Sequence, residues 1–168
     1  MQRLKMIVLI GVSLILLVSC GDPAEQFEII KGYVPQAIEV FEQSKEQLDI
    51  LRNGEFSENA ATVRLGEEGL YIFFSGHSGT IEYEDWDTIE WLSEKEKNAI
   101  LFLMCSEELQ LNFTWIAIST DFVFAEFFTY RRARLAIHHG EGGLVAHQSY
   151  TVDLGDGYTL WAYIMAGG

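Results

Sequence analysis

The spacing of apolar residues first predicts a long helix. From Phe27 to Arg52 apolar side chains recur at steps of three and four residues, with Lys45 as the one polar member of the stripe, which predicts an amphipathic helix. Pro35 lies inside this segment and predicts either a kink or a later helix start. Asn53-Gly54 is typical of a helix C-terminus. The stripe contains Ile30, Val34, Ala37, Ile38, Phe41, Lys45, Leu48 and Leu51.

A second helix is predicted near 94–105. Ser93 and Glu96 match the spacing of a capping box, in which the two residues satisfy each other's backbone N–H groups. Ala99, Ile100, Leu103 and Met104 would then face inward. An apolar run alone does not separate a buried helix from a buried strand, so a strand over 100–105 stays open as the alternative.

The other apolar runs predict strands. Thr62–Leu65 and Leu70–Phe74 flank a short Gly-Glu-Glu-Gly loop and predict an antiparallel pair. Gly155-Asp156-Gly157 predicts a tight hairpin between the last two strands. The sequence therefore predicts an α+β fold with an N-terminal helix, a small β segment, a second helix and an antiparallel β-meander of about five strands in the C-terminal half. The predicted meander strands are 113–118, 122–130, 132–138, 149–154 and 158–165.

The first twenty residues have the anatomy of a secretory signal. Arg3 and Lys5 precede a charge-free run from Met6 to Val18 that is too short to cross a bilayer as a helix. Leu17-Val18-Ser19-Cys20 resembles the lipobox of bacterial lipoproteins. This resemblance implies cleavage after Ser19 and a diacylglycerol thioether on Cys20. We therefore expect a signal peptide at 1–19, a lipidated cysteine and tether at 20–26, and a single domain at 27–168.

Charge excludes some partners. Loss of the leader would leave 9 basic and 25 acidic residues, a formal charge of −16. Nucleic acid would be repelled, and so would anionic headgroups, so the acyl chains alone would hold the protein at the membrane. With Cys20 lipidated, Cys105 has no disulfide partner.

Cys105 also belongs to the one motif that suggests catalysis. Ile72-Phe73-Phe74-Ser75-Gly76-His77 resembles the histidine motif of caspase-like cysteine peptidases, and Cys105 follows a second apolar run. The resemblance implies an envelope hydrolase with His77 as general base and Cys105 as nucleophile. Ser78 and Leu103 stand where that family has glycine and aspartate. We therefore predict a buried, inert thiol at Cys105.

The remaining histidines do not predict a metal site. His138, His139 and His147, with Glu141 between them, contain zinc-ligand types. Adjacent residues of a strand point to opposite faces, so His138 and His139 would ligate one metal only if the strand had already ended. The acidic residues of 82–90 lack the pattern of a calcium loop. We expect neither a metal nor a cofactor.

Three arginines, Arg131, Arg132 and Arg134, stand out in this acidic chain. Arg132, Arg134 and His138 would share one face of a strand, with Ala133, Leu135 and Ile137 on the core face. That stripe is the candidate anion site, because guanidinium groups bind carboxylates and phosphates bidentately. The alternative, which we favour, is cross-strand pairing with Glu126 or Asp153.

Together these features predict a lipid-anchored, extracytoplasmic lipoprotein whose domain binds an envelope protein or a small anionic ligand. The alternatives are the His77–Cys105 hydrolase and a structural or assembly role in the envelope.

Overall fold

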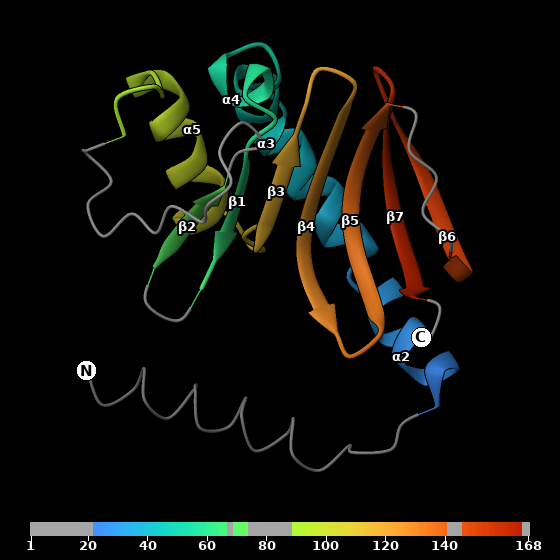
Figure 1. Cartoon of the computed structure of the whole chain (residues 1–168). Coiled ribbons are helices and arrows are strands. Elements are labelled where there is room, and N and C mark those ends of the chain that lie inside the picture. The colour runs from blue at the N-terminus through green and yellow to red at the C-terminus, as the bar shows by residue number, and fades with distance from the viewer. Residues whose placement is uncertain (1–21, 67–68, 74–88, 141–145, 166–168) are drawn as a thin grey trace, which may run out of the picture.

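The computed structural model describes residues 22–66, 69–73, 89–140 and 146–165, and it confirms the α+β class (Figure 1). The helices and strands are α2 (Pro23–Lys31), α3 (Val34–Arg52), α4 (Glu55–Glu58), β1 (Thr62–Leu65), β2 (Leu70–Phe73), α5 (Glu94–Cys105), β3 (Trp115–Ile118), β4 (Phe122–Tyr130), β5 (Ala133–Gly140), β6 (Ala146–Gly155) and β7 (Tyr158–Met165).

The seven strands in the described ranges belong to one antiparallel sheet in the order β2-β1-β3-β4-β5-β7-β6. The predicted β1–β2 pair is present, but it is not a separate segment, because β1 pairs with β3 and extends the sheet. The last two strands also depart from a simple meander. The chain reaches the sheet edge as β6 and returns as β7, which pairs with β5.

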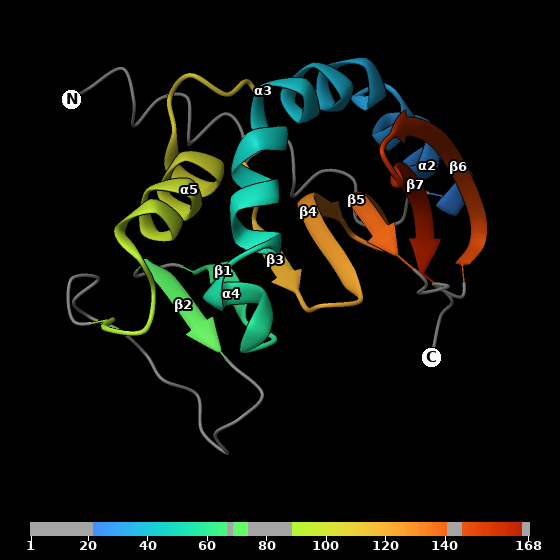
Figure 2. The ribbon, with the colours of Figure 1, turned by 90° about the horizontal axis from the view of Figure 1, so that it is seen from above.

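One face of the sheet forms the hydrophobic core with the helices. α2 and α3 lie behind the sheet in Figure 1, and Figure 2 shows α5 beside α3. The strand register aligns one apolar residue from each strand in a row that crosses the whole sheet. Six of the seven side chains are fully or almost fully buried, which makes this row the centre of the core. The row is Ile72, Val63, Ile116, Ala125, Ile137, Leu160 and Val152.

The predicted N-terminal helix is two helices. α2 begins at Pro23, within the segment expected to be a tether, because Asp22 caps it by accepting from the Ala24 N–H at 3.0 Å. A turn at 32–33 separates it from α3. Pro35 lies in the first turn of α3, so the later-start alternative is confirmed and the kink is wrong.

The second helix matches the sequence prediction. α5 spans Glu94–Cys105 and carries the expected capping box, with Ser93 accepting from the Glu96 N–H and Glu96 accepting from the Ser93 N–H. The strand alternative over 100–105 is wrong. The capping box favours the helix because the N–H groups of the first helical turn have no partner within the helix. The side chains of Ser93 and Glu96 supply such partners.

Candidate functional site

The face of the sheet opposite the helices carries a second row of aligned side chains, and all of them except one alanine are polar or aromatic. Directly paired residues of neighbouring strands share a face. The register therefore places side chains from all seven strands side by side on this outer face. The row runs Tyr71, Arg64, Trp115, Glu126, Ala136, Trp161 and Thr151. In Figure 1 this face is turned toward the viewer.

A pocket of about 270 Å³ opens in this face between β1 and β5. Its walls combine two arginines, one carboxylate, one indole and two threonines, which are the side-chain types that orient a polar ligand. It is lined by Arg64, Leu65, Thr114, Trp115, Glu126, Thr129 and Arg134. We call it the sheet-face pocket.

Glu126 is the fixed element of the sheet-face pocket. Its side chain is only 5% exposed, and each carboxylate oxygen has a partner. Oε2 accepts from Arg134 Nη1 at 2.5 Å, and Oε1 accepts from the Thr129 hydroxyl at 2.7 Å. Arg134 is held a second time by a contact of Nε with the sulfur of Met165 at 2.8 Å. One guanidinium is thereby paired within the protein.

Arg64 is the opposite case. It is exposed on β1 directly across from Trp115, and within the described part of the chain no hydrogen bond, ion pair or ring contact engages its guanidinium. Trp115 is half-buried and meets Phe124 edge to face, with ring centroids 5.2 Å apart. As far as the structure describes the chain, the pocket therefore presents an unpaired cation beside an indole ring.

The predicted anion stripe is divided by the structure. Arg134 and His138 lie on the outer face, and Arg134 pairs with Glu126, which is the internal alternative that we favoured from sequence. Arg132 lies in the β4–β5 turn, where its carbonyl accepts from the Met165 N–H. His138 packs against Trp161 with ring centroids 5.8 Å apart. Only Arg134 of the three lines the pocket.

The two adjacent histidines point to opposite faces of the sheet. β5 continues through Gly140, so the condition for joint metal ligation is not met. His139 lies on the helix side, where its Nε2 is 2.9 Å from Arg52 Nη1 and its ring is 4.8 Å from that of Tyr158. Among the described residues no group of three or more His, Cys, Asp or Glu is arranged to hold a metal. Glu141 and the side chain of His147 lie outside that part.

His139 belongs to a polar network that ties α3 to β5 and β7. The buried Tyr158 hydroxyl donates to Asp49 Oδ1 at 2.9 Å. Burial, followed by the carboxylate of Asp49, raises the Tyr158 pKa far above its usual value, so the hydroxyl stays protonated and keeps donating. Burial and then the charge of Arg52 lower the His139 pKa. The network joins helix to sheet, and the mutual pairing of its groups indicates a structural role.

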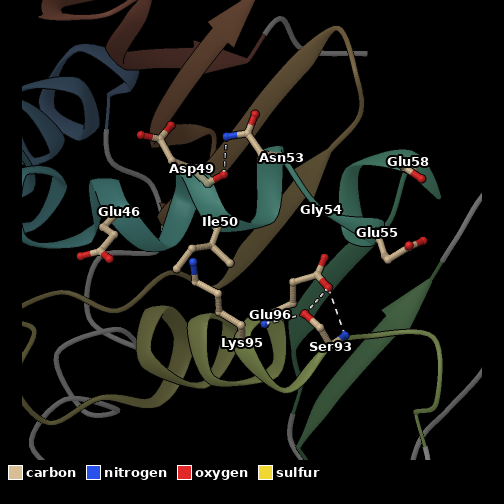
Figure 3. Close-up of a pocket in the computed structure, with 10 residues that line it drawn as sticks. All are labelled: Glu46, Asp49, Ile50, Asn53, Gly54, Glu55, Glu58, Ser93, Lys95 and Glu96. Atoms are coloured by element: carbon tan, nitrogen blue, oxygen red, sulfur yellow. Dashed lines mark hydrogen bonds between the residues drawn. The ribbon is translucent and has the colours of Figure 1, made fainter.

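A larger cavity of about 540 Å³ lies among α3, α4 and α5 (Figure 3). Its walls are acidic, but the buried member, Glu96, is satisfied by Ser93 and by the Phe56 N–H at 2.8 Å. Glu46 and Glu55 lie at opposite sides of the view and point away from each other (Figure 3). The carboxylates do not converge on a common point, so we assign this cavity to helix capping and a solvated acidic surface.

Cys105 corrects one sequence prediction. It is exposed at the end of α5 and not buried, because the inward positions of the helix are taken by Ile100, Leu103 and Met104. Its local surroundings still raise the pKa of the thiol through partial burial, which is the opposite of an activated nucleophile. His77 lies outside the described residues, as do the lipobox and Cys20. In the described part no helix is long and apolar enough to span a membrane.

Sequence reasoning missed the sheet-face pocket. Arg64 and Trp115 are separated by fifty positions and by α5, and only the pairing of β1 with β3 brings them together. The alternation of Arg64 with the apolar Val63 and Leu65 was a signal that its side chain leaves the core. Nothing in that alternation identified the neighbouring strand.

No protein-family model, curated protein or solved structure matches this chain.

Proposed function

We propose that the chain is a lipoprotein anchored through Cys20 on the extracytoplasmic side of the cell membrane, and that its α+β domain binds an envelope component through the outer face of the sheet. The observation that carries the binding role is Arg64, which lies beside Trp115 in the sheet-face pocket and has no partner among the described residues. An exposed guanidinium next to an aromatic ring is a common contact in recognition sites. The lipobox-like Leu17–Cys20 supports the membrane-anchored location.

A binding role is favoured over catalysis because the buried ionisable groups Glu126 and Tyr158 already have hydrogen-bond partners within the described structure. Glu126, Arg134 and Thr129 satisfy one another, and Tyr158 is protonated and bonded to Asp49. A general base or nucleophile needs a pKa that is shifted toward the working pH and a partner that orients it. The raised pKa of the Cys105 thiol gives no support to the hydrolase alternative.

The membrane anchor is tested by replacing each of the two cysteines of the chain in turn, so that each variant is the control for the other. Full-length protein is produced in a bacterial host, and the membrane fraction is analysed by mass spectrometry. We expect diacylglycerol on Cys20, loss of processing and membrane retention in Cys20→Ala, and normal processing in Cys105→Ala. An unmodified Cys20 in mature, membrane-bound protein would refute the anchor.

The binding face is tested by photo-crosslinking on cells. Phe122 lies on the outer face and is 37% exposed, and Leu101 lies on α5 and is 38% exposed. Each is replaced by p-benzoylphenylalanine, and the mass of the labelled peptide is measured after irradiation. We expect adducts at position 122 that are absent at position 101. Equal labelling, or no adduct at either position, would contradict a binding role for the outer face and favour a structural one.

A further inference from the structure

We propose that the sheet-face pocket binds a monoanionic carboxylate that is carried on a flat apolar group. The proposal rests on the proposed function in one respect, namely that the outer face of the sheet is the binding face. Arg64 would bind the carboxylate, Trp115 would pack against the flat group, and Arg134 would supply the second positive charge from its fixed position beside Glu126.

The charge balance of the pocket selects an anion with one negative charge. Arg64 and Arg134 contribute two positive charges, and the buried Glu126 contributes one negative charge. The pocket thus has a net formal charge of +1, within a chain whose formal charge is −14. A monoanion neutralises this charge, whereas a dianion would leave an excess negative charge beside a buried carboxylate, which is costly where water is scarce.

The geometry of the guanidinium groups favours a carboxylate over a point-like anion. Arg134 is held at Nη1 by Glu126 and at Nε by Met165, so its orientation is set before a ligand arrives. Arg64 has no such partner in the described structure, and its planar fork is therefore available for two parallel hydrogen bonds. The pre-orientation of Arg134 reduces the ordering cost of binding, whereas Arg64 loses side-chain freedom when it binds the carboxylate.

The indole ring sets the shape of the rest of the ligand. Trp115 stands in the cross-strand row between Arg64 and Glu126 and is partly exposed. Phe124 meets it edge to face at 5.2 Å and supports its position. At about 270 Å³ the pocket is slightly smaller than the sites of about 300–1,000 Å³ that hold drug-sized molecules. It therefore fits a small aromatic acid or the end of a larger molecule.

The test uses the mature lipidated protein in detergent micelles and benzoate as the probe, measured by saturation-transfer NMR. Benzamide has the same shape without the charge, acetate has the charge without the ring, and phenyl phosphate has the ring with more charge. We expect saturable binding of benzoate, with each of the three comparison probes weaker by about tenfold or more. N-acetylphenylalanine forms a further arm, and tighter binding than benzoate would identify the end of a peptide chain as the source of the carboxylate.

Variants locate the site. Arg64→Gln and Trp115→Leu are each expected to raise the benzoate Kd by about tenfold or more. Arg132→Gln removes the same charge from the exposed β4–β5 turn and should leave the Kd within about twofold, since rim charges contribute little. Circular dichroism checks that each variant is folded; Arg64 is exposed, so Arg64→Gln keeps the test valid if Trp115→Leu does not fold.

Three results would overturn the proposal: no saturable benzoate binding, equal binding of benzamide, or a loss of binding in Arg132→Gln that matches the loss in Arg64→Gln. Adducts at position 122 together with no benzoate binding would leave the proposed function standing and reject only this ligand class. Benzoate binding together with an unmodified Cys20 would retain the site and reject the anchor.

Discussion

The pair between Glu126 and Arg134 should make an unusually large contribution for a charge pair at the face of a sheet. The Glu126 side chain is 5% exposed and that of Arg134 is 23% exposed. Replacing Arg134 by Met keeps most of the apolar stem and leaves the Glu126 carboxylate buried with the Thr129 hydroxyl as its partner. Breaking a fully buried pair costs about 3–5 kcal/mol. Because water reaches Arg134, we expect a loss of about 2–3 kcal/mol in the free energy of unfolding.

A double-mutant cycle separates the charge effect from lost packing. Glu126→Gln alone should cost less than Arg134→Met, because the unpaired guanidinium can turn toward water whereas the unpaired carboxylate cannot. The double variant should be more stable than Arg134→Met alone, since it no longer buries an uncompensated charge. Arg132→Met, in the exposed turn, is the matched control and should change stability by less than about 0.5 kcal/mol.

The measurement is chemical and thermal unfolding followed by circular dichroism at neutral pH and physiological salt. For a domain of this size the expected loss corresponds to a fall in Tm of roughly 5–10 °C. The reasoning would be refuted if Arg134→Met were as stable as Arg132→Met, or if the double variant were less stable than both single variants.

Three further changes follow from individual positions. Burial and a neighbouring guanidinium lower the His139 pKa below 6.5 in the folded state. The contribution of His139 to the free energy of unfolding should therefore be full above pH 6.5 and decline as pH falls toward the lowered pKa. Urea titrations at pH 7.5 and 5.5 should show a smaller loss of stability between the two pH values in His139→Gln than in the unmodified protein. Gly140 and Gly155 both have positive φ. A Cβ at position 140 would lie 2.1 Å from the Asp121 carbonyl oxygen, whereas a Cβ at position 155 would meet no atom within 4 Å. Gly155→Ala should therefore cost about 1 kcal/mol and Gly140→Ala clearly more, and equal melting curves would contradict the clash. The Cys105 thiol is exposed with a raised pKa, so its alkylation in the folded protein should be slow at pH 7 and accelerate with rising pH; rapid labelling at pH 7 would show an activated thiolate.

Features set by neighbours in sequence were predictable. The capping box at Ser93 and Glu96 fixed the start of α5, and Pro35 offered the later start that α3 adopts. The β6–β7 hairpin followed from Gly155-Asp156-Gly157, whose residues Asp156 and Gly157 adopt the positive φ values that a tight turn needs. These signals are local, because caps and turns depend on residues within a few positions of each other.

The exposure of Cys105 shows where local reasoning stopped. An apolar run predicted a buried thiol, but a helix turns by 100° per residue, and the last residue of the run fell on the solvent side. The helix over this run was predicted correctly. The composition of the run did not determine which face of the helix the rest of the protein covers.

The candidate site depended entirely on strand order. Hydrophobic patterning was enough to predict the α+β class, the positions of most strands and the alternation that sends Arg64, Arg134 and Glu126 away from the core. The pairing of β1 with β3 arises from the folded sheet, and it places Arg64 next to Trp115 and within one pocket with the Glu126–Arg134 pair. Alternation has a period of two along each strand and carries no information about which strand lies beside it, so the partners of a sheet are selected by the packing of the whole core.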